Sequence, residues 1–287
     1  MAEISAATVM KLRKMSGQGM MDCKKALAES NGDIDEAMAT LRKKGLATLE
    51  KRAGRETTEG KVVSNISDDG KTAVMCSLCC ETDFAAKSAD FIEAAEKLVD
   101  YAMVCSSDSD PEALADTEIE GKKYEKMVSD LVSKTGEKTE LGDFARYKIE
   151  GTGVFGAYIH FNNKTGALVE IETSSDEVSA AVADLAREIA MHITATNPAA
   201  VDRDTFDPAV IEKERAIAAE QMKDKPAEII EKIVEGKMKK FLSENCLLDQ
   251  PFIKNDDMSV KEVVDQAAKQ AGGTAKIKCF ERIDVTG

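Results

Sequence analysis

Apolar side chains recur every three or four positions over residues 4–44, which is the period of helices packed on a common core. The pattern predicts three short helices over residues 4–15, 20–30 and 34–44, with turn residues between them. Asp33 and Glu36 have the spacing of a capping box at the start of the third helix. The small core is predicted to contain Val9, Leu12, Met20, Met21, Leu27, Ile34, Met38 and Leu41. We therefore expect residues 1–55 to form an N-terminal three-helix head whose last helix extends into a linker.

Beyond the linker the pattern changes to apolar-rich runs of strand length. Residues 61–66 and 72–80 predict a β-hairpin, and the helical period of the residues around Phe91 to Ala102 predicts a helix after it. The same unit recurs at an offset of 93 residues, which aligns Thr72 with Thr165 and ends in a helix over 176–195. An α+β fold with two related β-hairpin-plus-helix core subdomains follows from this repeat.

The boundaries of these units follow from the same pattern. We expect core subdomains over residues 56–140 and 141–198, with a helical insert near 124–133 between the two hairpins.

Residues 199–248 carry the signals of two helices joined by a short turn. Asp207-Pro208 and Lys225-Pro226 each open a helix, because proline suits the first helical position. So short a connection makes the two helices antiparallel. The seam of this helical hairpin is predicted from Ile211, Ile217, Met222, Ile229, Ile230, Ile233, Val234, Met238 and Phe241. Residues 249–287 are expected to return to the core, with a helix over 260–270 and a strand over 275–283.

Composition narrows the classes of function. Hydrophobic residues make up 43% of the chain and charged residues 32%, as in folded globular proteins. A net charge of -14 disfavours broad contact with a polyphosphate backbone, so no direct nucleic-acid binding is expected. No apolar run approaches the length of a membrane span, and the first residues lack the features of a signal peptide. We expect a cytoplasmic protein that does not bind a membrane.

Histidine and cysteine leave little room for catalysis. His160 and His192 are the only histidines, and His192 falls on the apolar face of a predicted helix, where a packed histidine is expected. His160 lies near a hairpin tip and is the better binding candidate. Cys76 and Cys79 are three apart in a predicted strand, so their side chains point to opposite faces and do not readily share a metal ion or a disulfide. We expect no metal and no cofactor, with a thiol oxidoreductase built on Cys76, Cys79 and Cys80 as the alternative.

The segment Glu81-Thr82-Asp83-Phe84-Ala85-Ala86-Lys87 is the most informative part of the chain. The offset of 93 maps Asp83 onto Asp176, and both are expected to be helix N-caps. It also maps Phe84 onto Glu177, so a charge stands where the first unit has an aromatic ring. That exchange predicts a solvent-facing Phe84, an anchor for a protein partner. The alternative is that Phe84 folds back to cover its own helix.

Several motifs together resemble one known family. They are 16–27 (SGQGMMDCKKAL), 81–85 (ETDFA), Tyr158-Ile159-His160, 189–193 (IAMHI), 234–241 (VEGKMKKF) and Gln250-Pro251-Phe252. In this order they are similar to bacterial elongation factor Ts over nearly the whole chain. The resemblance implies a translation elongation factor and not an enzyme. Such a factor binds elongation factor Tu·GDP, accelerates GDP release by disturbing the magnesium and phosphate site, and allows GTP to rebind.

The resemblance also implies roles for individual residues. Thr82, Asp83, Phe84 and Ala85 would form the wedge that enters the partner's nucleotide domain and displaces magnesium, with Ala85 standing where a valine is usual. Met20, Met21 and Lys24 of a ubiquitin-associated-like head would dock on the same domain, and His160 would meet the partner's other domains. The helical hairpin would be the family's coiled coil. The alternative function is an adaptor that binds without changing the rate of nucleotide release.

Overall fold

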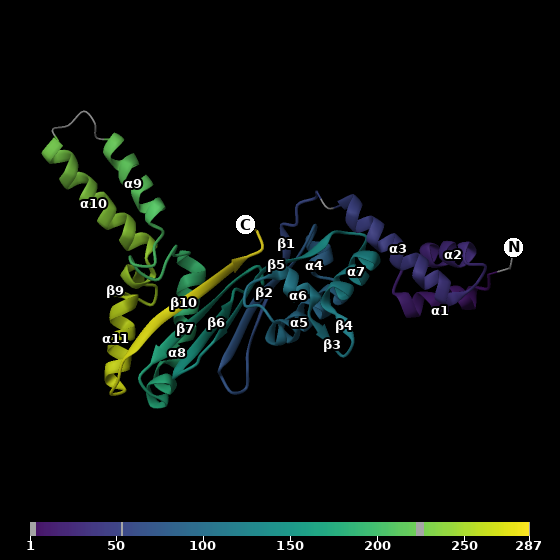
Figure 1. The fold of residues 1–287 in the computed structure, drawn as a ribbon, viewed down its shortest axis with the longest axis horizontal. Coiled ribbons are helices and arrows are strands. Elements are labelled where there is room, and N and C mark those ends of the chain that lie inside the picture. Colours follow the sequence, from purple (N-terminus) through teal and green to yellow (C-terminus); the bar gives the residue numbers. More distant parts are fainter. Residues whose placement is uncertain (1–3, 53, 222–226, 287) are drawn as a thin grey trace.

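The head is a bundle of three helices at one end of the molecule (Figure 1). The computed structural model describes residues 4–52, 54–221 and 227–286. The three predicted helices are confirmed as α1 (Ala6–Ser16), α2 (Met20–Glu29) and α3 (Ile34–Arg52), and α3 includes the predicted helical extension. Their buried core consists of Val9, Leu12, Cys23, Ala26, Leu27, Ala37 and Leu41.

Two details of the predicted head are wrong. Met20 and Met21 are exposed, because α2 turns Cys23 and Leu27 toward the core instead. Only one of the two hydrogen bonds of the predicted capping box forms. The Asp33 carboxylate accepts hydrogen bonds from the amides of Asp35 and Glu36, but the Asp33 amide donates to the Ser30 carbonyl.

The first sheet is antiparallel, with the strand order β1-β2-β5. The predicted hairpin is confirmed as β1 (Glu59–Ile66) and β2 (Thr72–Cys80). Its third strand, β5 (Thr139–Lys148), has no counterpart among the predicted elements. β5 runs across residue 140, where the sequence placed a boundary, so the first sheet extends to Lys148.

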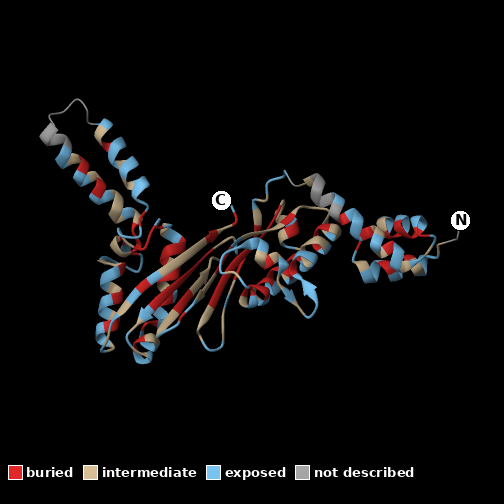
Figure 2. Ribbon diagram, viewed as in Figure 1, coloured by how far each residue is buried: buried red, intermediate tan, exposed pale blue. Residues whose placement is uncertain are grey.

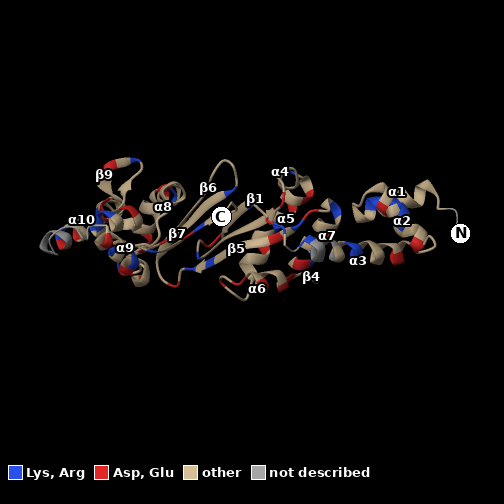
Figure 3. Ribbon diagram, turned by 90° about the horizontal axis from the view of Figure 1, so that it is seen from above, with Lys and Arg blue, Asp and Glu red and all other residues tan. Residues whose placement is uncertain are grey.

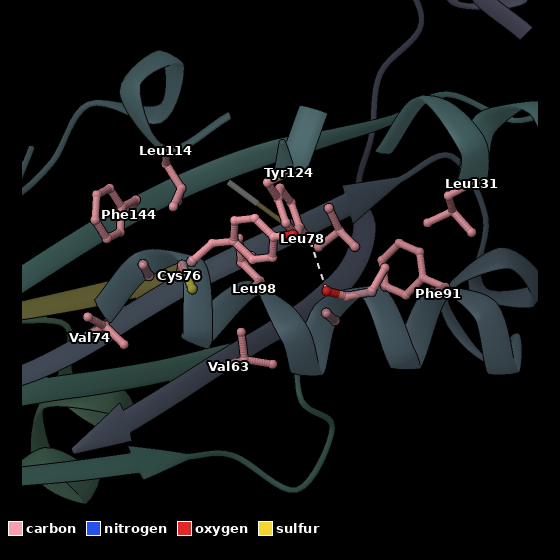
Figure 4. Close-up of a cluster of buried hydrophobic side chains, with 14 of the residues drawn as sticks. Val63, Val74, Cys76, Leu78, Phe91, Leu98, Leu114, Tyr124, Leu131 and Phe144 are labelled. Atoms are coloured by element: carbon pink, nitrogen blue, oxygen red, sulfur yellow. Dashed lines mark hydrogen bonds between the residues drawn. The ribbon is translucent and has the colours of Figure 1, made fainter. Parts of the chain in front are cut away.

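Helices cover the outer face of the first sheet. α5 (Ala89–Val104) packs on β2, and α7 (Tyr124–Thr135) packs on α5 and β5. The short elements α6 (Pro111–Asp116), β3 (Glu118–Ile119) and β4 (Lys122–Lys123) connect the two helices. α7 confirms the predicted helical insert. Leu98, Leu114 and Tyr124 are fully buried in this cluster, where the Tyr124 hydroxyl donates a 2.9 Å hydrogen bond to the Ala94 carbonyl (Figure 4).

The second sheet has the order β10-β7-β6 and is also antiparallel. The strands β6 (Gly153–Ile159) and β7 (Thr165–Thr173) lie at the predicted offset from β1 and β2, and α8 (Asp176–Thr196) confirms the predicted second helix. The third strand, β10 (Ala275–Asp284), returns from the far end of the sequence.

The inner faces of the two sheets share one apolar layer, and helices cover the outer faces (Figure 2). Val62 and Met75 of the first sheet pack there with Phe155, Leu168 and Ile283 of the second. α8 and α11 (Val260–Gln270) cover the outer face of the second sheet. The core is therefore built from four layers that contain residues from both ends of the chain.

A helical hairpin projects from the second sheet, formed by α9 (Pro208–Glu220) and α10 (Ala227–Asn245) (Figure 1). Its seam contains Val234 and Met238 as predicted, but Ile217 is exposed and Ala218 faces α10 in its place. The side chains of Met222, Ile229 and Ile230 and the helix start at Lys225-Pro226 lie outside the described residues. The 3-10 turn η1 (Leu247–Asp249) and the strands β8 (Pro251–Phe252) and β9 (Asn255–Ser259) lead to α11.

Candidate functional site

The wedge segment forms a short helix directly after β2. This helix, α4 (Asp83–Ala86), is capped by Thr82, whose hydroxyl accepts a 3.2 Å hydrogen bond from the Ala85 amide. Asp83 is therefore the first helical residue and not the N-cap, because the extended backbone of Thr82 brings its hydroxyl over the free amides. The second unit shows the same shift by one residue, with Ser175 capping α8 in place of Asp176.

Phe84 points into solvent with 81% of its surface exposed. The next residue, Ala85, is buried in the core under the first sheet, which fixes the orientation of α4. The alternative in which Phe84 covers its own helix is thereby contradicted. Glu177, its counterpart in α8, is exposed as well, so the interpretation of the repeat is confirmed.

One polar contact joins this helix to the rest of the core, and a second lies within the helix itself. The Thr82 hydroxyl lies 3.0 and 2.9 Å from the two carboxylate oxygens of Glu137 and donates to that carboxylate. Asp83 forms an ion pair with Lys87 at 2.6 Å, one turn further along. The hydrogen bond from Lys87 lowers the pKa of Asp83, so its carboxylate is charged at neutral pH. A rigid turn thus presents an aromatic ring beside a negative charge.

The turn that follows His160 lies next to α4. A cleft of about 310 Å³ separates the two and is lined by Asp83 and Lys87 on one side and by Asn162 and Lys164 on the other. The Val62 amide donates a 2.7 Å hydrogen bond to the Asn163 carbonyl, which joins this turn to β1. The structure therefore brings part of the second unit to the wedge.

His160 is half-buried at the end of β6, and its Nδ1 lies 3.3 Å from the Tyr158 hydroxyl. The neighbouring Phe161 is fully exposed, with its ring centroid 4.3 Å from that of His160. Sequence reasoning did not single out Phe161. The available signal was an aromatic residue in a turn that otherwise contains asparagines.

The head residues lie apart from the wedge. Met20, Met21 and Lys24 are exposed on α2. The head surface and the wedge are separated by α3 (Figure 1).

His192 is a packed histidine, as predicted. Its side chain is fully buried, with Nε2 2.8 Å from the Gln250 side-chain oxygen, and its Nδ1 accepts a hydrogen bond from the Ile253 amide. Burial lowers the pKa of His192. The neutral ring satisfies both contacts, so this residue serves the fold.

The cysteines do not support redox chemistry. Cys76 and Cys80 face the helices, whereas Cys79 faces the second sheet, as the strand geometry predicts. Burial raises the pKa of Cys79 to about 11 and that of Cys80 to about 12, the opposite of what a redox thiol needs. All seven cysteines are free, and no group of three or more metal-binding side chains occurs in the described ranges. Over those same ranges, every helix is too short or too polar to cross a bilayer.

Comparison with known proteins agrees with these motifs. The family model described as Elongation factor TS matches residues 81–286. The elongation factor Ts of Nitratiruptor sp. is 43% identical over 98% of this chain and 93% of its own length. Those of Desulfovibrio desulfuricans and Clostridium acetobutylicum are 40% and 38% identical, over 99% and 98% of this chain and 99% and 92% of their own lengths. The chain belongs to the elongation factor Ts family.

Proposed function

We propose that this chain binds elongation factor Tu·GDP and accelerates GDP release by disturbing the magnesium and phosphate site, after which GTP binds. As a member of its family the chain is a translation elongation factor and not an enzyme. The observation that carries the proposed mechanism is the exposed Phe84 on the capped helix α4.

Phe84 suits insertion between two helices of a partner. An exposed aromatic side chain offers a large apolar surface and has only two rotatable bonds to immobilise. The Thr82 cap and the buried Ala85 fix the backbone beneath it, so little ordering is required on binding. Asp83 adds a carboxylate next to the ring, and this charge would act on a site that holds a cation and phosphates.

Binding energy alone can drive the exchange. If the factor binds the nucleotide-free partner more tightly than the GDP form, it must weaken GDP binding by the same factor. A coupling of about 4 kcal/mol corresponds to a change in affinity of roughly a thousandfold. No covalent step by this chain is needed.

The other exposed residues would enlarge the contact. Met20, Met21 and Lys24 of the head, as a ubiquitin-associated-like bundle, would dock on the same nucleotide domain of elongation factor Tu. His160 would contact the partner's other domains, together with the neighbouring Phe161. The α9–α10 hairpin would correspond to the family's coiled coil.

The test is stopped-flow release of fluorescent GDP from elongation factor Tu in the presence of excess unlabelled GDP. Wild type should accelerate release by orders of magnitude, and Phe84→Ala should lose most of that acceleration. The unfolding free energy of Phe84→Ala should differ from that of wild type by less than about 0.5 kcal/mol, because an exposed side chain contributes little to the core.

Val104→Ala is the matched control. Val104 is also an exposed apolar residue. It is the last residue of α5, whereas the wedge lies near the start of that helix, about 22 Å away along the helix axis. Its exchange activity should equal that of wild type. Binding of wild type without faster release would support the adaptor instead, and an unfolded Phe84→Ala variant would contradict an exposed wedge.

A further inference from the structure

α3 links the head surface to the base of the wedge. It has 19 residues and a length of about 28 Å, and its first half belongs to the head while its second half lies against the core (Figures 1 and 3). The second half of α3 contacts the core at two places.

The first contact is a close crossing between α3 and α7. Gly45 is buried at this point, and a Cβ atom placed there would lie 1.5 Å from the Ser133 Oγ and 2.8 Å from the Ser133 Cβ. Any larger residue here would collide with the Ser133 side chain, so Gly45 allows α3 and α7 to approach closely. The turn between α1 and α2 also meets α7, because a Cβ atom at Gly17 would lie 2.6 Å from Cε near the flexible end of Lys134.

The second contact is a cluster around Glu81, which we call the α3 clamp: Glu81, Arg52, Arg55 and Lys138. Arg52, the last residue of α3, donates through Nη1 to both carboxylate oxygens of Glu81, at 2.7 and 2.8 Å. Arg55 donates to the same carboxylate at 2.8 Å, and the Lys138 amide donates at 2.6 Å. The Lys138 ammonium also donates to the Arg55 carbonyl at 3.0 Å.

Glu81 occupies the position between the end of β2 and the cap of the wedge. Its side chain is only 10% exposed. Burial alone would raise the pKa of Glu81, but hydrogen bonds from the Lys138 amide, Arg52 and Arg55 outweigh it and hold that pKa at about 2. The clamp therefore stays charged at neutral pH and connects the end of α3 to the residue that precedes Thr82.

We infer that Glu81 is a positioning residue, which together with Arg52 and Arg55 holds the head surface and the wedge at one fixed spacing. Gly45 and Arg52 are seven residues apart, about two turns, so α3 is held at two points and cannot pivot about either. This inference rests on the proposed function, in which both surfaces meet one partner. Two surfaces with a preset geometry bind as a unit, because the second contact forms at a high effective concentration.

The spacing can be measured without the partner. Spin labels at Ala28→Cys in the head and Asp100→Cys on α5, both exposed positions, report the distance by pulsed electron spin resonance. We expect one narrow distance distribution, which broadens when Arg52→Gln and Arg55→Gln are introduced together. Labelled wild type gives the background from native thiols, of which six are buried.

A matched control is Lys254→Gln, which breaks the 2.8 Å ion pair with Glu188 far from the clamp. It should leave the distribution narrow. Glu81→Gln removes the carboxylate of the same contact and should broaden the distance distribution. An unchanged distribution in both clamp variants would overturn the inference, whatever the exchange assay gives.

The exchange assay separates positioning from local support of the wedge. Loss of the clamp should raise the half-saturating concentration of the factor about tenfold and leave the maximal rate of GDP release nearly unchanged. This effect should disappear in a background of Met20→Ala, Met21→Ala and Lys24→Ala, because the head then has no contact to position. An equal effect in both backgrounds would show that the clamp acts only on α4 and would overturn the inference. If wild type does not accelerate GDP release, the proposed function is wrong. The distance measurement then still tests whether the clamp fixes the position of the head relative to the core.

Discussion

Phe84 and Glu177 occupy the second position of the helix that follows the second strand in each half of the molecule. The next position, Ala85 or Val178, is buried in both halves. The buried residue at the third position is common to both halves and belongs to the fold, whereas the residue at the second position differs between them. The exposed aromatic ring belongs to the first copy alone, and this difference could be predicted from the sequence.

The caps of these helices show where such prediction ends. Thr82-Asp83 and Ser175-Asp176 each offer two adjacent residues whose side chains suit an N-cap. The choice depends on which backbone is extended and which amide its oxygen reaches. Here the hydroxyl residue takes the cap in both cases, a shift of one residue that spacing alone cannot resolve.

The buried His192 predicts a dependence of stability on pH. Its pKa is lowered from 6.5 in the folded protein, so between that lowered value and 6.5 the unfolded chain binds a proton that the folded chain does not. Stability should therefore fall as the pH drops below 6.5, by up to about 1.4 kcal/mol for each pH unit.

Urea unfolding of wild type and His192→Asn at pH 7.5 and 5.5 measures this contribution. Carboxylates titrate alike in both proteins, so the difference between the two unfolding free energies isolates the histidine. The unfolding free energy of wild type should exceed that of His192→Asn by less at pH 5.5 than at pH 7.5. An equal difference at both pH values would mean that folding leaves the pKa of His192 unchanged.

At the scale of elements, the strands that complete the two sheets differ in how well the sequence reveals them. β10 follows a clear run of strand residues and was predicted almost to its ends. β5 was missed because Gly142-Asp143 interrupts its apolar pattern and is typical of a turn. In the structure the register with β2 shifts at this point, between the pairs Cys76–Phe144 and Leu78–Leu141, so a bulge lies inside the strand.

The contact between β6 and α8 predicts a glycine that cannot be replaced. A Cβ at Gly156 would lie 2.1 Å from the Ala186 carbonyl oxygen and 2.7 Å from the Arg187 nitrogen, both of them backbone atoms. Gly156→Ala must push strand and helix apart and should cost about 1–3 kcal/mol or more of unfolding free energy.

Denaturant unfolding measures the loss of stability in Gly156→Ala, with a substitution at a second glycine as the control. Gly236 lies exposed within α10 with nothing within 4 Å of an added Cβ, and alanine favours a helix. The stability of Gly236→Ala should not fall below that of wild type. A stable Gly156→Ala variant would contradict the close approach.

At the scale of the whole molecule, stability should be unevenly distributed. The core sheets are packed on both faces, whereas the α9–α10 hairpin is held by a small cluster around Ala218, Val234 and Met238. Regions with few buried contacts open locally at a lower free energy than the global unfolding.

Native-state hydrogen exchange tests this distribution. Amides within α10 should exchange at a lower opening free energy and a lower denaturant dependence than those of β7, which needs global unfolding to exchange. The amides of β2 serve as a second core reference. Equal opening free energies in α10 and β7 would show that the hairpin unfolds only with the core.

The place of β10 beside β7 has a consequence for synthesis on the ribosome. β5 completes the first sheet roughly sixty residues after β2, whereas β10 is made roughly a hundred residues after β7. At about 5–20 residues per second, this leaves the β7 edge open for about 5–20 s. An open edge rich in buried apolar residues can pair with other nascent chains. The second half of this translation factor is thus the part that most depends on protection during its own translation.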